Sequence, residues 1–391
     1  MTVQTAATPP AVRVVVAPDS FKESLTAARV CAALAAGVRR AVPEAEVVAV
    51  PMADGGEGTT DALVAATGGR LATHRVVDAL GRPVAAALGL LGNGRTAVVE
   101  LAAAAGLEQV DPADRDPLRS TTEGVGALMV RALDAGVDRL LLGIGGSATN
   151  DGGAGLLVAL GARLLDGAGT LLRPDVEGLE RVERVDLAGL EPRLGSVDLQ
   201  VACDVDNPLL GDRGAAAVFG PQKGLTPAQV RRCDVALEHW ADVLEAACPV
   251  ADRERPGAGA AGGAGFALQA LGATLRPGIE LVADAAGLAG LLEGADLVFT
   301  GEGRVDAQTL GGKTPAGVLA LARDAGVPGV VIGGSVGPGS EQLLQRGACA
   351  VLSLSPGAAE LSELVEHAAE HLERTAQQAM GLWLAGRAAR R

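Results

Sequence analysis

The sequence has few aromatic residues and no run of hydrophobic residues that is typical of a membrane span. Aromatic side chains make up 2% of the 391 residues and tyrosine is absent, although 48% of the residues are hydrophobic. The core must therefore be aliphatic, which is typical of parallel sheets covered by helices rich in alanine and leucine. One stretch without charge, residues 256–275, contains six glycines and a glutamine, so we expect no membrane association.

Positive charge is also scarce. The formal net charge is −14, with 33 basic and 47 acidic residues, and no run rich in lysine or arginine offsets it. Nucleic-acid binding needs basic surface to contact the phosphate backbone, so this balance argues against such a partner. A small phosphorylated ligand remains compatible with it, provided that cations gather in one cleft.

Cysteine and histidine are too sparse for a disulfide framework or a zinc site. The five cysteines are scattered and form no C-x-x-C pair, and two of the four histidines are isolated. The thiols are expected to be reduced, which predicts a cytoplasmic protein. No Ser-His-Asp set can be assembled from these histidines. The cysteines are Cys31, Cys203, Cys233, Cys248 and Cys349.

Short aliphatic runs alternate with segments of helical period, which predicts an α/β fold built on a parallel sheet. The predicted strands span residues 12–17, 46–50, 139–144, 296–300, 327–332 and 348–354. Nearly every run leads into a loop rich in Gly, Ser, Asp or Lys. Ligands of open α/β sheets bind at the carboxyl ends of the strands, so we expect these loops to converge.

Two regions interrupt this alternation and predict a second α/β domain inserted into the first. Residues 71–100 have the pattern of strands joined by turns, and residues 165–281 mix strand and helix character. The predicted first domain comprises 12–70, 120–164 and 282–385; the inserted domain comprises 71–119 and 165–281; residues 1–11 are predicted to be a disordered tail.

The run RLLLGIGGSATNDGGAG, residues 139–155, is the strongest candidate for an anion-binding loop. Glycines let the backbone approach a ligand, while backbone N–H groups and hydroxyls supply donors. Gly143, Gly145 and Ala148 also satisfy the dinucleotide pattern G-x-G-x-x-G/A, so an NAD-dependent oxidoreductase is an alternative. A dinucleotide fold would start its helix directly after this loop, whereas the sequence continues with Thr-Asn-Asp-Gly-Gly.

The strand-end loops together supply carboxylates and a few cations, but almost no histidine. These residues are Asp19, Asp54, Glu57, Asp151, Glu302 and Asp306, with Lys22, Arg304 and Lys313. Such a set suits phosphoryl transfer, in which carboxylates hold Mg²⁺, one Asp accepts the hydroxyl proton, and cations with backbone N–H groups stabilise the transferred charge. Lys313 precedes a Thr-Pro pair typical of a helix start, where its charge would adjoin a phosphate.

Five motifs resemble the bacterial glycerate kinases of type I, in the same order from about residue 12 to 383. They are APDSFK (17–22), ADGGEGT (53–59), GIGGSATNDGG (143–153), FGPQKG (219–224) and GEGRVD (301–306). The resemblance implies a flavodoxin-like domain with a second, inserted α/β domain. It also implies an ATP- and Mg²⁺-dependent kinase that phosphorylates D-glycerate at the 2-hydroxyl. Glu23 departs from the family, which usually has glycine after the lysine.

We assign roles within this set as follows. Lys22 and Ser20, with Arg304, are expected to bind the glycerate carboxylate, while Asp306 is the candidate base, with Asp54 and Lys22 as further catalytic residues. Gly145, Gly146, Ser147 and Lys313 are expected to bind phosphate, and Glu302 and Asp151 the metal, although Asp151 can equally turn toward its own loop.

Several alternatives stay open at this point. Phosphorylation at the 3-hydroxyl would give 3-phosphoglycerate, and a small-acid binding protein would use a similar cleft without turnover. The expected partners are glycerate and ATP, with neither nucleic acid nor membrane. A homodimer is left open.

Overall fold

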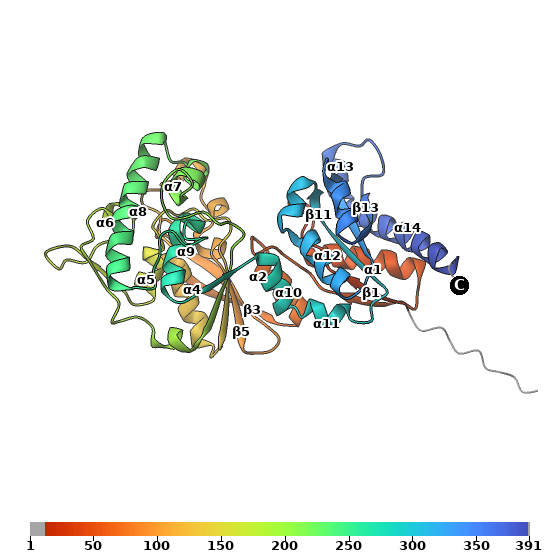
Figure 1. Cartoon of the computed structure of the whole chain (residues 1–391), viewed down its shortest axis with the longest axis horizontal. Helices are drawn as coiled ribbons and strands as arrows, with labels where there is room; N and C mark the ends of the chain where they lie inside the picture. The colour runs from red at the N-terminus through yellow and green to blue at the C-terminus, as the bar shows by residue number, and fades with distance from the viewer. Residues whose placement is uncertain (1–11, 390–391) are drawn as a thin grey trace, which may run out of the picture. The chain divides into compact units, whose positions relative to one another are not determined.

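The computed structural model describes residues 12–389, so the predicted tail at residues 1–11 lies outside the described part. The chain divides into two compact units. The discontinuous unit comprises the residues up to Ala53 and those from Ala283, and the inserted unit comprises Asp54–Val282. Both are α/β, as Figure 1 shows. None of the helices between residues 12 and 389 has the length and apolar character that crossing a bilayer requires.

The discontinuous unit is built on a five-stranded sheet in the order β13-β12-β11-β1-β2, in which every pair is parallel. Its strands are β1 (Arg13–Val16), β2 (Glu46–Ala49), β11 (Leu297–Val305), β12 (Gly329–Val336) and β13 (Ala348–Ser353). Counted along this unit, the order is the 2-1-3-4-5 arrangement of flavodoxin-like folds. The switch point, where such folds bind ligands, therefore falls between β1 and β11.

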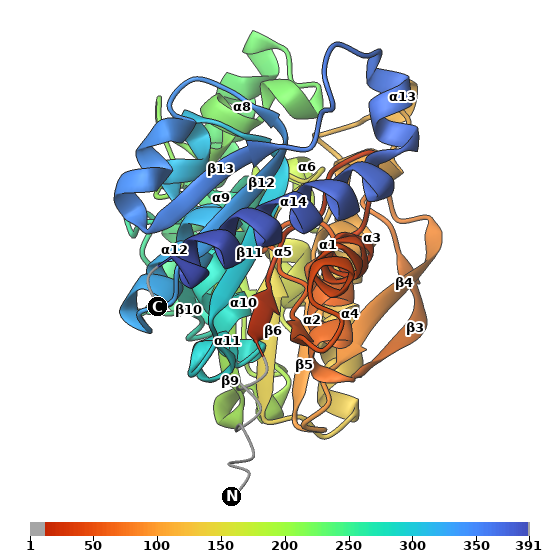
Figure 2. The same ribbon diagram turned by 90° about the vertical axis from the view of Figure 1, so that its right-hand side faces the viewer.

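Helices cover this sheet through aliphatic contacts. They are α1 (Ala27–Ala41), α11 (Leu288–Leu292), α12 (Thr314–Asp324), α13 (Leu361–Glu366) and α14 (Ala368–Ala388), with the 3₁₀ segments η5 (Ala307–Gly311) and η6 (Ser340–Arg346). Helices α1 and α14 lie side by side (Figure 2). A Cβ at Gly37 would stand 2.2 Å from the carbonyl oxygen of Glu373, so only glycine permits this close approach.

The inserted unit contains a six-stranded mixed sheet in the order β10-β9-β6-β5-β4-β3, of which β5-β4 and β4-β3 are antiparallel. Its strands are β3 (Arg70–Val77), β4 (Pro83–Leu90), β5 (Thr96–Glu100), β6 (Arg139–Gly143), β9 (Asp198–Ala202) and β10 (Thr274–Arg276), with the separate pair β7 (Arg163–Leu165) and β8 (Arg184–Asp186). The turns at 81–83 and 92–94 join β3 to β4 and β4 to β5, as the sequence predicted.

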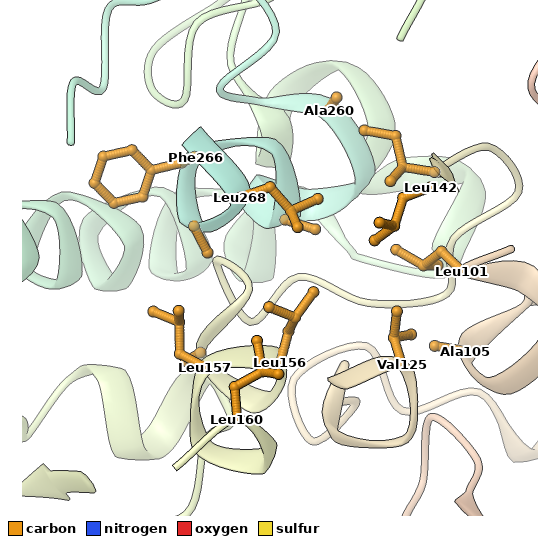
Figure 3. Close-up of a cluster of buried hydrophobic side chains, with 14 of the residues drawn as sticks. Leu101, Ala105, Val125, Leu142, Leu156, Leu157, Leu160, Ala260, Phe266 and Leu268 are labelled. Atoms are coloured by element: carbon orange, nitrogen blue, oxygen red, sulfur yellow. The ribbon is translucent and has the colours of Figure 1, made fainter. Parts of the chain in front are cut away.

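The helices of the inserted unit enclose an aliphatic core. They are α2 (Thr59–Thr67), α3 (Ala102–Ala105), α4 (Glu123–Asp134), α5 (Ala154–Ala159), α6 (Val176–Leu179), α7 (Ala215–Phe219), α8 (Pro227–Ala247) and α9 (Ala260–Ala270), with η1 (Leu107–Gln109), η2 (Pro112–Asp114), η3 (Pro192–Ser196) and η4 (Pro221–Lys223). Helix α10 (Gly278–Ala285) contains the boundary between the units. Figure 3 shows leucines from β6, α5 and α9 gathered with Val125 and Phe266 in this core.

The observed domain boundaries differ from the predicted ones. Residues 54–70 and 120–164 were predicted in the first domain, but they belong to the inserted unit. Strand β6 pairs with β5 and β9 and not with β1. Buried parallel strands all have similar apolar sequences, so local pattern does not indicate which sheet a strand joins. Strands β11 and β12 also extend through GEGRV and GGSV, which were expected to be loops.

Candidate functional site

One group of candidate residues lies at the switch point of the discontinuous unit. Asp19 follows β1, and its N–H donates to the carbonyl of Gly301 in β11 at 2.8 Å. Its Oδ1 accepts from the N–H of Ser20 at 2.6 Å, and its Oδ2 accepts from the hydroxyl of Thr314 at 2.6 Å. Thr314 is the first residue of α12, so the loop after β1 is joined directly to a helix N-terminus.

Glu302 lies beside this loop, inside strand β11, and is 8% exposed. Its Oε1 accepts from the hydroxyl of Thr309 at 2.5 Å, and its Oε2 is 3.7 Å from Nζ of Lys313. The structure thus brings together two residues that the sequence assigned separately to metal and phosphate. A carboxylate next to a lysine at a helix start is suited to hold a phosphate group together with its counter-ion.

Asp306 and Arg304 form a local pair at the end of β11. Nε of Arg304 donates to Oδ2 of Asp306 at 2.7 Å, and the N–H of Gln308 donates to Oδ1 at 2.9 Å. The backbone N–H of Gln308, and then Arg304, lower the pKa of the Asp306 carboxyl because they stabilise its charged form. The carboxylate is therefore ionised at neutral pH and able to accept a proton.

Lys22 is exposed in a tight loop closed by a bridge between Phe21 and Leu25. Glu23 has a φ of 61°, in the left-handed region that favours glycine. A positive φ is the conformation that glycine, the residue expected here from the family resemblance, adopts without strain. The loop lies against β11, since a Cβ at Gly303 would be 3.5 Å from the backbone nitrogen of Lys22.

The inserted unit carries candidate residues of its own, where two glycine-rich segments touch. A Cβ at Gly143 would lie 2.6 Å from the carbonyl oxygen of Gly55, and one at Gly145 would lie 3.1 Å from Cα of Gly56. Gly145 and Gly146 are exposed, whereas Ser147 is buried. The solvent-facing part of the loop is thus bare backbone, which suits contact with phosphate oxygens.

Asp54 lies next to these glycines, at the start of the inserted unit. Its Oδ1 accepts from the N–H of Gly56 at 3.2 Å. Burial, and to a smaller extent the negative charge of Asp54, raise the pKa of Asp204. Two carboxylates thus adjoin the glycine contact, and Asp54 is the one that was assigned a site role.

Asp151 occupies a different environment from the one that its predicted metal-binding role requires. The residue is fully buried, and its carboxylate accepts from the N–H and the hydroxyl of Thr122 at 2.7 and 2.8 Å. The N–H groups of Gly153 and Gly155 donate to it at 3.2 and 3.1 Å. Burial raises its pKa, and these donors counteract the rise. The observed carboxylate thus serves its own loop, the second of the two orientations considered above.

The oxygen donors of the discontinuous unit fit a magnesium ion. Asp19 follows β1 and Glu302 lies within the adjoining strand β11. The hydroxyls of Thr314 and Thr309 donate to these two carboxylates. Within residues 12–389 no group of three His, Cys, Asp or Glu residues gathers to hold a metal by itself. Magnesium is typically held by one or two carboxylates together with substrate phosphates, so this set is sufficient for it.

Sequence reasoning missed the two threonines. Thr309 and Thr314 lie in a segment from which only Lys313 was selected. Their hydroxyls gain a role only through contact with carboxylates. The carboxylate that Thr314 contacts, that of Asp19, is 295 positions away in the sequence. The one available signal was the Thr-Pro pair at the start of α12, which indicates a helix N-terminus.

Comparison with known proteins places this α/β fold and its loops in one family of kinases. The sequence model described as the Glycerate kinase family matches residues 14–384. A glycerate kinase of Bacillus subtilis (strain 168) is 49% identical over 366 residues, 93% of this chain and 96% of the relative. The glycerate 2-kinase of Escherichia coli (strain K12) is 44% identical, with the same coverage. The chain belongs to the glycerate kinase family.

A solved structure supports the same assignment. The crystal structure of a candidate glycerate kinase 2 from Salmonella typhimurium LT2 is 47% identical and matches with a TM-score of 0.89. The match covers 96% of this chain and 99% of that one. The predicted fold class, a flavodoxin-like sheet with an inserted α/β domain, is thereby confirmed.

Proposed function

We propose that this protein is a glycerate kinase of type I, which transfers the γ-phosphoryl group of ATP to the 2-hydroxyl of D-glycerate and releases 2-phosphoglycerate and ADP. The observation that carries the proposal is the 44% identity, over 93% of the chain, to a relative named glycerate 2-kinase. Phosphorylation at the 3-hydroxyl is the alternative. The alternative function of an NAD-dependent oxidoreductase is disfavoured, because α5 begins only at Ala154 and not directly after the G-x-G-x-x-A pattern.

The substrate roles are assigned to the discontinuous unit. Lys22 and Ser20, which follow β1, bind the glycerate carboxylate, and Arg304 contributes a second cation. Asp306 accepts the proton of the attacking hydroxyl. Transfer of a phosphoryl group proceeds through a loose transition state, so a carboxylate of low pKa is adequate to orient the hydroxyl and take its proton. Asp54, at the start of the inserted unit, is assigned as a further catalytic residue.

The phosphates of the nucleotide are assigned to backbone N–H groups of the glycine-rich loop after β6 and to one lysine. Gly145 and Gly146 offer N–H groups on the exposed part of their loop, with Ser147 beneath them, and Lys313 adds charge beside the N-terminus of α12. Glu302 and Asp19 would hold Mg²⁺, which neutralises charge on the phosphate oxygens when bound. Asp151 would act through the four hydrogen bonds that fix its loop.

The proposal is tested by incubating the purified protein with D-glycerate, ATP and Mg²⁺. We expect ADP release that depends on glycerate, and a product that enolase converts directly to phosphoenolpyruvate, as it does 2-phosphoglycerate. A product that enolase consumes only after addition of a phosphoglycerate mutase would establish the 3-hydroxyl as the acceptor. ADP release independent of glycerate, or saturable binding without turnover, would refute the proposed activity.

We infer a cytoplasmic location and leave assembly to direct measurement. All five cysteines are free thiols in the structure, consistent with a reducing compartment. Light scattering coupled to gel filtration would decide between a monomer of 38.9 kDa and a homodimer.

A further inference from the structure

The chain uses lysine at only three positions, against thirty arginines. These are Lys22, Lys223 and Lys313. Two of them are the site lysines discussed above, and the third is unassigned. Arginine is used almost everywhere else, so the lysine at position 223 indicates a role that needs an ammonium group and that a guanidinium does not fill. Lysine presents a compact charge on a slim stem, whereas the guanidinium is a wide planar fork.

Lys223 ends the segment η4 and is 1% exposed, which is rare for lysine. Its Nζ donates a 2.6 Å hydrogen bond to the carbonyl oxygen of Thr149, in the glycine-rich loop after β6. A buried ammonium without such a partner would be strongly destabilising. The side chain therefore reaches through the core of the inserted unit to one backbone atom of this loop.

Two further carbonyls of the same loop are held from α8, which follows η4 in the chain. Sγ of Cys233 lies 3.8 Å from the carbonyl oxygen of Asn150, and Nε1 of Trp240 donates to that of Gly152 at 3.1 Å. Lys223 is the charged member of these three contacts, and a charge-assisted hydrogen bond is the strongest kind. The buried half of the loop is thus anchored from residues 223–240, while Gly145 and Gly146 face solvent.

The surroundings of Lys223 include several titratable or charged groups. Asp151 and Cys233 are close enough to affect it, and Arg115 and Asp116 line the same small pocket. Burial lowers the pKa of Lys223 to about 8, and the negative charges that Cys233 and Asp151 carry when ionised limit the fall. The ammonium form is therefore close to its titration at physiological pH.

We propose that Lys223 is a positioning residue of the kinase site, whose buried ammonium fixes the Thr149 carbonyl and thereby holds the exposed Gly145–Gly146 backbone in the conformation that receives the ATP phosphates. Lys223 does not touch the nucleotide. This inference rests on the proposed function, because it takes the glycine-rich loop as the phosphate-binding element.

The test is Lys223→Met, which keeps most of the length of the unbranched side chain but removes the charge and the donor. A W383F background leaves Trp240, which contacts the same loop, as the sole tryptophan reporter. We expect the Kd for ATP, measured by equilibrium binding, to rise roughly tenfold to a hundredfold, the effect of one lost charge-assisted hydrogen bond, with a smaller change in the Kd for glycerate. The emission of Trp240 should shift. Arg231→Met, which removes an exposed cation of the same unit, is the matched control and should change none of these values.

Chemical rescue of a second variant by added amines tests the same inference independently of Lys223→Met. Lys223→Ala should recover part of its ATP affinity with ethylammonium or propylammonium, but not with 1-propanol, because only the amines restore the charge. Unchanged ATP affinity and Trp240 emission in both variants would overturn the inference, as would equal rescue by the alcohol. ATP binding and Trp240 emission are measured without turnover. A wild-type protein that binds ATP but does not phosphorylate glycerate would therefore refute the proposed function and leave this test valid.

Discussion

The hydroxyl of Thr314 donates a 2.6 Å hydrogen bond to Oδ2 of Asp19, joining the N-terminus of α12 to the loop after β1. Thr314 is fully buried. The contact links two segments 295 residues apart at the switch point of the sheet, where flavodoxin-like folds bind their ligands. It fixes the orientation of a carboxylate that we assign to the metal, so it connects stability directly with catalysis.

Thr314→Val should lower both the free energy of unfolding and the kcat of glycerate phosphorylation. The variant keeps the shape of the side chain but deletes a hydrogen bond to a charged group, so the free energy of unfolding should fall by about 1.5–3 kcal/mol. The kcat of glycerate phosphorylation should fall as well, because Asp19 loses its orientation. Thr314→Ser retains the hydroxyl and is the control, expected to stay near wild type in both measurements. Denaturant titration and steady-state kinetics in parallel would check this; equal behaviour of the two variants would contradict it.

Asp306→Asn tests the proposed base. We expect kcat to fall by roughly 10² to 10⁴ with little change in KM for glycerate, the usual effect of removing a general base. Because the pKa of Asp306 is lowered, wild-type kcat should show no loss between about pH 7 and pH 5 from this group. Asp324→Asn alters an exposed carboxylate at the end of α12 and should leave the kinetics unchanged. A D306N enzyme with more than half of the wild-type kcat would remove Asp306 from this role.

Glu23 combines a strained backbone with a negative charge next to Lys22, and two variants separate these effects. Glu23→Gly relieves the positive φ, which costs a non-glycine residue roughly 1–2 kcal/mol, although part of the gain is offset by the larger freedom of glycine in the unfolded chain. We expect the free energy of unfolding to rise by up to about 1 kcal/mol. Glu23→Gln keeps the backbone strain and should not raise the free energy of unfolding.

The same pair reports on substrate binding. If Lys22 binds the glycerate carboxylate, both variants should lower KM for glycerate, because each removes a competing negative charge. Thermal unfolding and glycerate titration give the two answers independently. A decrease in KM for Glu23→Gly alone would point to loop geometry, and no decrease in either would argue against Lys22 as the carboxylate ligand.

The sequence predicted the α/β class and the positions of six strands, because continuous apolar runs followed by glycine-rich loops are a local signal. It did not predict that β6 pairs with β5 and β9, since neighbours in a sheet depend on contacts between distant segments. The metal-binding role predicted for Asp151 also depended on orientation. Its carboxylate points to Thr122 and two glycine N–H groups, and nothing in the local sequence distinguishes this from a carboxylate that faces a ligand.

The last prediction concerns the pH dependence that Lys223 produces. Its pKa of about 8 in the folded protein lies below the ordinary value of 10.5. Below about pH 8 both states carry the proton, and the folded state bears the full cost of the buried charge. Between about pH 8 and 10.5 the unfolded chain binds a proton that the folded protein has released, so the contribution of Lys223 to the free energy of unfolding rises with pH, by about 3 kcal/mol in total. Activity should move in the opposite direction, because the neutral amine holds the Thr149 carbonyl less firmly.

Denaturant titrations of wild type and Lys223→Met from pH 7 to 10 would measure this contribution as a difference. The difference is needed because burial raises the pKa values of Cys31 and Cys233 to about 12, which makes stability fall over the same range. Tyrosine, which would titrate there, is absent from the chain. We expect wild type to gain stability relative to Lys223→Met as pH rises, while its kcat/KM for ATP declines above about pH 8 and that of the variant does not. Parallel stability curves for the two proteins would show that Lys223 does not titrate in this window. Parallel curves of kcat/KM for ATP would show that its charge does not hold the loop.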